Sequence, residues 1–397
     1  MKAILLFNAK IVFVDRILKG AIVVSNGKIE QIIEQSNFDI DDFQRFQQVD
    51  LEGKYLSAGF IDIHVHGGGG FDFMDGTAEA FEQIAIAHAR YGTTSMVPTT
   101  LTTTTERLIE TLEAFNEVKG KEYLGAKLIG MHLEGPYFAL SQKGAQDPRY
   151  IRNPDPTEYK PLIEKYSSIV RWSAAPELDG ALEFGRFLKE KNILAAIAHT
   201  DAIYEDVCKA YDVGYSLLTH FYSAMSGVSR RDAFRYAGVV EAGYLIDDLD
   251  VELIADGIHL PAPLLQLIYK IKGKDKMILI TDAMRAAGTS VTSSILGSLE
   301  DGMEVLIEDD VAKLKDRSAF AGSVATSNRL VKTLLNLTDI PLVEVIQMIT
   351  LNPARVMKID KKTGSIAIGK DADLVVFDEN ITVLMTLVQG RIVHSQL

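Results

Sequence analysis

Residues 59–70 read GFIDIHVHGGGG, an apolar run that ends on two histidines and then on four glycines. Side chains alternate across a strand, so His64 and His66 point to one side while Ile63 and Val65 point to the other. Both imidazoles can therefore reach one atom, which is typical of metal ligands at the end of a strand. Two imidazoles on a solvated sheet face have the same spacing, so the rest of the chain has to decide.

Seven further apolar runs follow the first, and longer segments with helical periodicity separate them. They read TSMVPTT, AKLIGMHLE, IVRWSAAPE, ILAAIAHT, YSLLTH, DVELIADGIH and MILITDA. Runs without polar alternation are typical of parallel strands that are covered on both faces, and eight strand–helix repeats predict an α/β fold, a TIM-like (β/α)8 barrel over residues 57–356. An open doubly wound sheet is the alternative, but no Gly-rich phosphate-binding motif opens a helix.

The two ends of the chain differ from this middle part. Residues 1–56 alternate apolar and polar positions around an Asn26-Gly27 hairpin signal, which predicts a small antiparallel β unit. Residues 357–397 contain similar short β runs. We therefore expect both termini to form one small β-sandwich domain beside the barrel.

Composition limits the function classes. The chain has 397 residues, of which 47% are hydrophobic and 24% charged, as in globular proteins. Its net charge of −13 argues against a nucleic-acid or anionic-membrane partner. The single cysteine, Cys208, fits a reducing compartment, and the N-terminus shows neither a signal peptide nor a membrane span. The cytoplasm is the expected location.

Histidines and carboxylates gather where the apolar runs end. His64 and His66 close the first run, His132 and Glu134 the third, His199 the fifth, His220 the sixth and Asp282 the eighth, while His259 follows the seventh. Only His88 and His394 lie elsewhere. In a barrel of this type the carboxyl ends of the strands meet at one mouth, so these side chains are predicted to converge.

Each of these residues also has a structural interpretation, as a polar strand end, an ion-pair partner or a helix cap. Together they would place uncompensated charge in a dry cavity, which costs several kcal/mol per group. A divalent metal removes this difficulty. The predicted ligands are His64, His66, Glu134, His199, His220 and Asp282, with Glu134 placed to bridge two ions.

Three residues outside this ligand set receive other roles, and Asp282 receives a second one. His132 is interpreted as an outer residue that orients a ligand by a hydrogen bond through its other ring nitrogen, and His88 as a helix-face residue. His259 is expected to polarise the carbonyl under attack. Asp282 is expected to accept a proton from the attacking water and to return it to the leaving group.

The chain resembles the amidohydrolase superfamily and, within it, the N-acetylglucosamine-6-phosphate deacetylases. The stretches that carry the resemblance are AGFIDIHVHG, GMHLEGPY with KGAQ, AAPE, AHTDA, THFYSAM, ELIADGIH, LITDAMRAAG, FAGS and LNPARVMKIDKKTGSIAIGKDADLVVF. The resemblance implies a homodimeric enzyme that holds one or two divalent metals, zinc or iron, and hydrolyses the acetamide of a phosphorylated N-acetyl amino sugar.

By position, the resemblance also implies substrate contacts. Gln146 falls where the family contacts the sugar, and Ala224 where a backbone amide meets the phosphate. Ser223 replaces the family's usual asparagine in the same segment. Arg231 has the spacing of a phosphate-binding arginine that the family takes from the neighbouring subunit, and Arg230 or Arg235 could substitute. These departures put the substrate in question and leave the hydrolytic chemistry intact.

Three alternatives therefore stay open: the galactosamine epimer as substrate, another amide as substrate, and a scaffold without catalysis. A scaffold is expected to have lost ligands or the proton-transferring aspartate, whereas this chain keeps them all.

Overall fold

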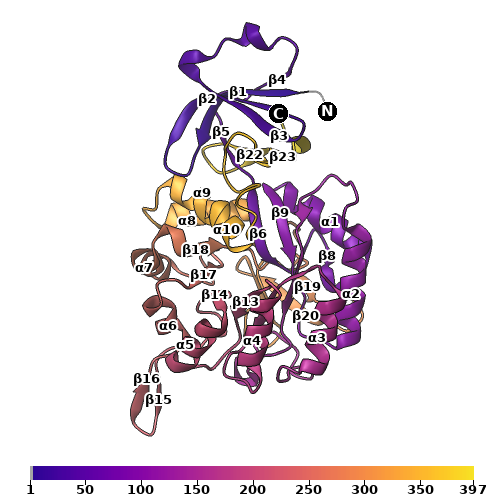
Figure 1. The fold of residues 1–397 in the computed structure, drawn as a ribbon, viewed down its shortest axis with the longest axis vertical. Helices are drawn as coiled ribbons and strands as arrows, with labels where there is room; N and C mark the ends of the chain where they lie inside the picture. Colours follow the sequence, from indigo (N-terminus) through magenta and orange to yellow (C-terminus); the bar gives the residue numbers. More distant parts are fainter. Residues whose placement is uncertain (1–2) are drawn as a thin grey trace.

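The computed structural model describes residues 3–397, in which an eight-stranded sheet at one end of the molecule adjoins a larger α/β body (Figure 1). The sheet combines both ends of the chain: β1 (Ile4–Val12), β2 (Ile17–Ser25), β3 (Lys28–Glu34), β4 (Gln47–Asp50), β5 (Tyr55–Ala58), β22 (Leu374–Phe377), β23 (Val383–Val388) and β24 (Arg391–Ser395). Pairing of β5 with β22 joins the two ends, as expected from their similar patterns.

Local sequence explains part of this sheet. Asn26 and Gly27 both have positive φ, 49° and 76°, and form the turn between the antiparallel strands β2 and β3. The prediction of a purely antiparallel unit is wrong, because β1 pairs in parallel with β4 and β5. A long connection through two 3₁₀ turns at residues 35–43 carries the chain back for that pairing. The domain boundaries at 56 and 356 stay predictions; β5 crosses the first.

Each apolar run of the middle part contains a strand. They are β6 (Phe60–Val65), β9 (Thr93–Pro98), β10 (Lys127–Leu128) with β11 (Met131–Glu134), β12 (Ile169–Ala174), β13 (Leu194–Ile197), β14 (Tyr215–Leu218), β17 (Asp250–Leu253) and β18 (Met277–Leu279). They form two parallel sheets, β10-β9-β6 and β11-β12-β13-β14-β17-β18. Parallel bridges Thr99–His132 and Val65–Ala283 connect these sheets at both ends.

Helices follow most of these strands and cover them. They are α1 (Ala78–Ala89), α2 (Thr105–Val118), α3 (Pro156–Lys165), α4 (Ala181–Glu190), α5 (Tyr204–Val213), α6 (Val239–Leu245), α7 (Ala262–Lys272), α8 (Ser327–Leu337), α9 (Leu342–Ile349) and α10 (Leu351–Val356). Thr104, in the threonine run that follows β9, caps α2 by accepting from the Arg107 amide. Within residues 3–397, every helix is too short or too polar to cross a membrane.

Three small β elements interrupt the alternation of strands and helices, and the sequence pattern did not predict them. They are the pair β7 (Gly67–Gly68) and β8 (Phe71–Asp72), the hairpin β15 (Ser229–Arg231) and β16 (Phe234–Tyr236), and the sheet β19 (Ser293–Leu296), β20 (Met303–Glu308) and β21 (Val311–Leu314). The β15–β16 hairpin projects from the end of the molecule opposite the terminal sheet (Figure 1).

A buried ion pair fastens the β19–β21 sheet to the loop after β8. Arg285 is 6% exposed and donates to both oxygens of Asp75 at 2.6 and 2.8 Å, and to the carbonyl oxygen of Gly297 at 2.7 Å. A single guanidinium therefore holds two segments that are far apart in the sequence.

Replacing Arg285 with methionine is expected to lower the free energy of unfolding by about 3 kcal/mol, because Asp75, whose side chain is 12% exposed, is left as an uncompensated charge with little access to water. Urea denaturation followed by circular dichroism measures this change. The matched control is Arg16→Met, which removes an exposed arginine paired with Asp15 and is expected to leave the midpoint unchanged. Equal midpoints for both variants would contradict the assigned role.

Candidate metal centre

The carboxyl ends of the parallel strands bring together two groups of potential metal ligands that share one carboxylate. The first group is His64, His66 and Glu134, and the second is Glu134, His199 and His220. Within each group the donor atoms lie within 4.8 Å of one another. The predicted convergence of these five side chains is therefore present in the structure.

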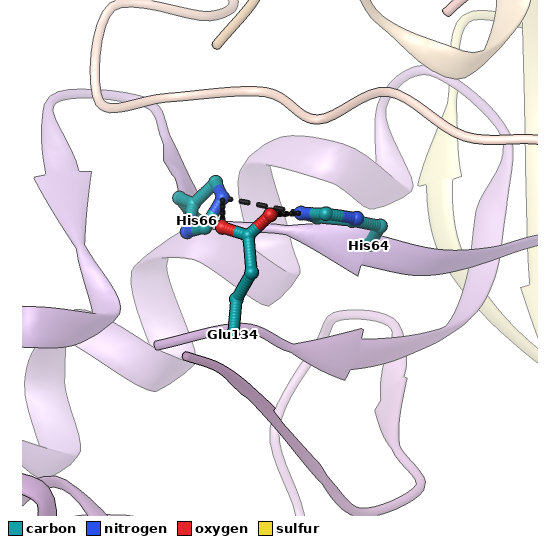
Figure 2. Close-up of side chains that lie close together, drawn as sticks. All are labelled: His64, His66 and Glu134. Carbon is teal, nitrogen blue, oxygen red and sulfur yellow. Dashed lines mark hydrogen bonds and ion pairs between the residues drawn. The ribbon is translucent and has the colours of Figure 1, made fainter. Parts of the chain in front are cut away.

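The first group is tightly packed and buried. Nε2 of His64 and Nε2 of His66 lie 3.3 Å apart, and the Glu134 carboxylate lies 3.5 Å from the first and 3.3 Å from the second (Figure 2). His64 lies on β6, His66 directly follows it and Glu134 ends β11, and the three side chains point toward a common centre. Three donor atoms thus face a single position, as a cation requires.

The second group shares Oε1 of the same carboxylate, the oxygen that also faces His64. Oε1 of Glu134 lies 3.0 Å from Nε2 of His220 and 3.4 Å from Nε2 of His199. Nδ1 of His199 lies 2.8 Å from the backbone carbonyl oxygen of Gln142. Nδ1 of His220 lies 3.1 Å from the backbone carbonyl oxygen of Ser223. A proton held on Nδ1 leaves the Nε2 lone pair free for a metal.

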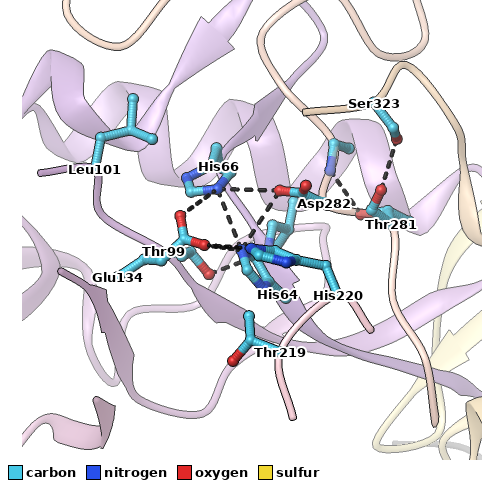
Figure 3. Close-up of polar contacts among 12 residues, drawn as sticks. His64, His66, Thr99, Leu101, Glu134, Thr219, His220, Thr281, Asp282 and Ser323 are labelled. Carbon is cyan, nitrogen blue, oxygen red and sulfur yellow. Dashed lines mark hydrogen bonds and ion pairs between the residues drawn. The ribbon is translucent and has the colours of Figure 1, made fainter. Parts of the chain in front are cut away.

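Asp282 follows β18 and completes the set of predicted ligands. Its Oδ1 lies 3.1 Å from Nε2 of His66 and 3.4 Å from Nε2 of His64 (Figure 3). The backbone amide of Asp282 donates to the His64 carbonyl oxygen, and the Ser323 amide donates to the Asp282 carbonyl oxygen. Backbone bonds on both sides therefore fix the position of this carboxylate.

Strained backbone conformations cluster at this site. His199, His220 and Asp282 have φ of 46°, 32° and 48°, in the left-handed region that non-glycine residues seldom adopt. Each costs about 1–3 kcal/mol, and such residues persist where a functional geometry needs them.

Electrostatics couples the histidines to the carboxylates. Burial opposes protonation of His64, but Glu134 and Asp282 outweigh it and raise the pKa of His64 to about 9. Burial also lowers the pKa of His66, but the same two carboxylates outweigh it and raise this pKa to about 10. Burial disfavours the Glu134 anion, yet the surrounding imidazoles hold its pKa well below the usual value. Protons thus supply the positive charge that a divalent ion would replace.

The donor set fits a divalent cation. Two imidazole pairs and two carboxylates, all buried, form a set that suits zinc or iron. Arg171 is fully buried beneath the site, but its guanidinium is paired with Glu252, which is not one of the predicted ligands.

A cavity of about 210 Å³ opens over these groups. The predicted substrate contacts that line it are Gln146, Ser223, Ala224 and His259. Gln146 donates from Nε2 to Oε2 of Glu134 at 2.8 Å and accepts from the Thr102 amide at 2.8 Å. The Gln146 amide is thus fixed beside the carboxylate, and its contact with a sugar stays a prediction.

His259 is held by the carboxylate of Asp256. Its Nδ1 lies 2.8 Å from Asp256 Oδ2, and its backbone amide donates to Oδ1 of the same residue. Burial alone would raise the pKa of Asp256, but the hydrogen bond from His259 holds it below its usual value. With Nδ1 engaged, Nε2 is the ring atom free for a substrate. The Phe320 ring lies 4.6 Å from this imidazole and also lines the cavity.

The remaining predicted residues lie outside the cluster. Arg231 is exposed on the β15–β16 hairpin. His132 contacts the hydroxyls of Thr99 and Ser173, so its interpretation as a residue that hydrogen-bonds a ligand is wrong; its ring packs edge-on against His64 at 4.8 Å. His88 lies on a buried face of α1, and its Nε2 is 2.9 Å from the carbonyl oxygen of Gly67, beside His66.

Sequence reasoning missed Arg171 and Glu252. Each is a charged residue within a short buried strand, Arg171 in IVRWSA and Glu252 in DVEL, and a charge at such a position was the available signal. A buried charge in a parallel strand needs a partner, but the sequence does not specify which residue provides it.

Comparison with known proteins gives consistent matches. Residues 55–393 match the amidohydrolase family. The N-acetylglucosamine-6-phosphate deacetylase of Bacillus subtilis (strain 168) is 32% identical over 396 residues, covering 98% of this chain and 97% of the relative. The N-acetylgalactosamine-6-phosphate deacetylase of Escherichia coli O157:H7 is 33% identical over 342 residues, covering 86% and 88%.

A solved structure from Mycobacterium smegmatis agrees over the full length of both chains. It is an aspartate-to-alanine variant of N-acetyl-D-glucosamine-6-phosphate deacetylase in complex with N-acetyl-D-glucosamine-6-phosphate. The TM-score is 0.90 at 26% identity, with 100% of each chain covered.

Proposed function

The chain belongs to the amidohydrolase family, and from this premise we propose that it hydrolyses the acetamide of N-acetylglucosamine-6-phosphate to glucosamine-6-phosphate and acetate. The observation that carries the proposal is the Glu134 carboxylate, which lies between two histidine pairs and beside Asp282 in an open cavity. Relatives that bear this activity in their names match almost the whole chain.

We also infer that the middle part is a closed (β/α)8 barrel. An open sheet has two free edges, whereas the bridges Thr99–His132 and Val65–Ala283 connect the two parallel sheets to each other at both ends. We interpret the terminal sheet as the flanking β-sandwich, since separate apolar clusters pack on its two faces: one contains Leu56 and Leu374, the other Leu5 and Val23.

In the proposed reaction, one or two divalent ions, zinc or iron, would be held by His64, His66, Glu134, His199, His220 and Asp282. When bound, such an ion would lower the pKa of the attacking water and polarise the amide carbonyl. Water adds to the carbonyl carbon and the C–N bond breaks. Asp282 takes the proton from the attacking water and gives it to the leaving nitrogen, so that acetate and the amine form.

The residues that line the cavity would orient the substrate. His259, with Nδ1 engaged by Asp256, would donate from Nε2 to the carbonyl oxygen as charge develops on it. Gln146, Ser223 and Ala224 would contact the sugar and its phosphate. Cytoplasmic location stays a prediction that rests on the single cysteine, Cys208.

The phosphate contact is proposed to come from a second copy of the chain. The β15–β16 hairpin follows β14, on the same end of the body as the metal ligands, and exposes Arg230, Arg231 and Arg235. Phe234 at its tip is 73% exposed, which suits burial against a partner. In a protein with a net charge of −13, a local guanidinium fork is needed to attract an anionic substrate.

Replacing Arg231 with glutamine is expected to raise KM for the phosphorylated sugar about 10- to 100-fold with little change in kcat, because the lost contact binds a part of the substrate that does not react. Steady-state kinetics of acetate release measures both constants. The control is Arg186→Gln, on α4, which is expected to leave KM unchanged. A normal KM for Arg231→Gln would remove this residue from the phosphate site.

The proposed function is tested by acetate release from N-acetylglucosamine-6-phosphate, its galactosamine epimer and unphosphorylated N-acetylglucosamine. We expect the first to have the highest kcat/KM, and the third to fall by at least about 100-fold. The epimer is included because a relative named N-acetylgalactosamine-6-phosphate deacetylase is 33% identical to the chain, and one named N-acetylglucosamine-6-phosphate deacetylase is 32% identical. Faster turnover of the epimer would reassign the substrate, and no release from any of the three would refute the proposal.

A further inference from the structure

A buried ion pair lies directly beneath the first group of ligands and takes no part in the chemistry proposed above. Arg171 on β12 and Glu252 on β17 are both fully buried. Nη1 and Nη2 of the guanidinium donate to the two carboxylate oxygens, the second bond at 2.9 Å. A fully buried pair of this kind is costly to desolvate and is often replaceable by apolar residues without loss of stability, so stability alone explains it poorly.

The carboxylate of this pair also faces a predicted metal ligand. Oε2 of Glu252 lies 3.5 Å from Nδ1 of His64, while Nε2 of the same ring lies on the side of Glu134. His64 Nδ1 has no hydrogen-bond partner within residues 3–397, and Glu252 provides an acceptor atom close to it. The structure thus places an acceptor behind the ring and the metal position in front of it.

The guanidinium reaches the backbone that carries the same histidine. Nη1 of Arg171 donates to the carbonyl oxygen of Ile63 at 3.0 Å, and Nη2 donates to Oγ1 of Thr219 at 3.0 Å. Ile63 directly precedes His64, so one arginine fixes both the strand of this ligand and the carboxylate behind its ring.

We propose that the Arg171–Glu252 pair is a positioning device for the first metal position, in which Glu252 orients the His64 ring and holds its proton on Nδ1. The inference rests on the proposed function, because it assumes that the first group binds an ion. Carboxylates that accept from the outer nitrogen of a ligating histidine fix its tautomer and ring orientation. At the second position, backbone carbonyl oxygens next to His199 and His220 do this work. Glu252 therefore acts on the first position, whereas Arg171 also contacts Thr219, the residue before His220 of the second position.

The test is zinc binding by the metal-free full-length protein, measured by calorimetric titration with zinc alone and by metal analysis after dialysis. Wild type is expected to bind two ions. Glu252→Gln, which keeps the shape of the side chain and removes its charge, is expected to bind one ion with unchanged affinity and the other about 10- to 100-fold more weakly. Asp250→Asn is the matched control, since Asp250 lies on the same strand and pairs with Arg355.

A double variant, Arg171→Met with Glu252→Leu, separates positioning from folding, because it leaves no uncompensated charge. It is expected to fold and to lose the same ion, so it decides the question if Glu252→Gln does not fold. Two ions bound with wild-type affinity by either folded variant would overturn the proposal, and so would a single ion in wild type. Absence of zinc binding in wild type would instead refute the proposed function.

Discussion

Replacement of Asp282 by asparagine is expected to lower kcat about 1,000-fold while the metal content stays at the wild-type level. The amide keeps the size of the side chain and an oxygen donor, but it cannot take a proton from the attacking water. General acid–base groups contribute about 100- to 10,000-fold, and one residue here serves both transfers. Acetate release and metal analysis on the same preparation measure the two quantities.

The control for Asp282 is Asp248→Asn, which changes an exposed aspartate whose side chain is 77% accessible. It is expected to leave kcat unchanged. If Asp282→Asn hydrolyses as fast as wild type with its metal in place, the proton transfer belongs to another group. If it loses metal along with activity, Asp282 acts chiefly as a ligand.

Replacement of Glu134 by glutamine is expected to abolish zinc uptake at both positions and to reduce acetate release to background. The reason is that both groups of ligands share this one carboxylate. Zinc at 1,000 times its dissociation constant stabilises a folded protein by about 4 kcal/mol per site. Thermal unfolding with and without zinc should therefore show a large upward shift of Tm for wild type and none for the variant.

Glu177→Gln is the matched control for Glu134. Glu177 is a largely buried carboxylate in the segment after β12, where it accepts from the Thr200 hydroxyl and the Asp201 amide. Glu177 belongs to neither ligand group in residues 3–397, so its replacement is expected to leave the stabilisation by zinc unchanged. A normal zinc shift in Glu134→Gln would disprove the shared-carboxylate arrangement.

Much of the site could be predicted because it follows from strand geometry. Alternation places His64 and His66 on one side of a strand, and the common direction of parallel strands brings Glu134, His199 and His220 to the same end. Both arguments need only local sequence and one rule about parallel sheets. The eight strands were predictable for the same reason, since apolar runs without polar alternation are characteristic of them.

What could not be predicted depends on side-chain direction and on insertions. The pairing of Arg171 with Glu252 joins residues 81 positions apart, and nothing local specifies that their side chains meet. The β19–β21 sheet has ordinary alternating strands, but its place beside the cavity depends on the long-range contact of Arg285 with Asp75. To predict the parallel pairing of β1, one would need to know the path of residues 35–50, and this segment has no strong hydrophobic periodicity.

The joining of both ends of the chain in one sheet has a consequence for biosynthesis. Leu56 pairs with Val376, about 320 residues later, and Val65 forms a bridge with Ala283. At about 5–20 residues per second a ribosome takes roughly 15 to 60 s to supply the missing partner. During that interval the first strands have unpaired edges. Until Asp282 has been made, His64 and His66 also lack this neighbouring carboxylate. The full set of proposed ligands is therefore available only after Asp282 has been made, and truncated translation products should be prone to self-association.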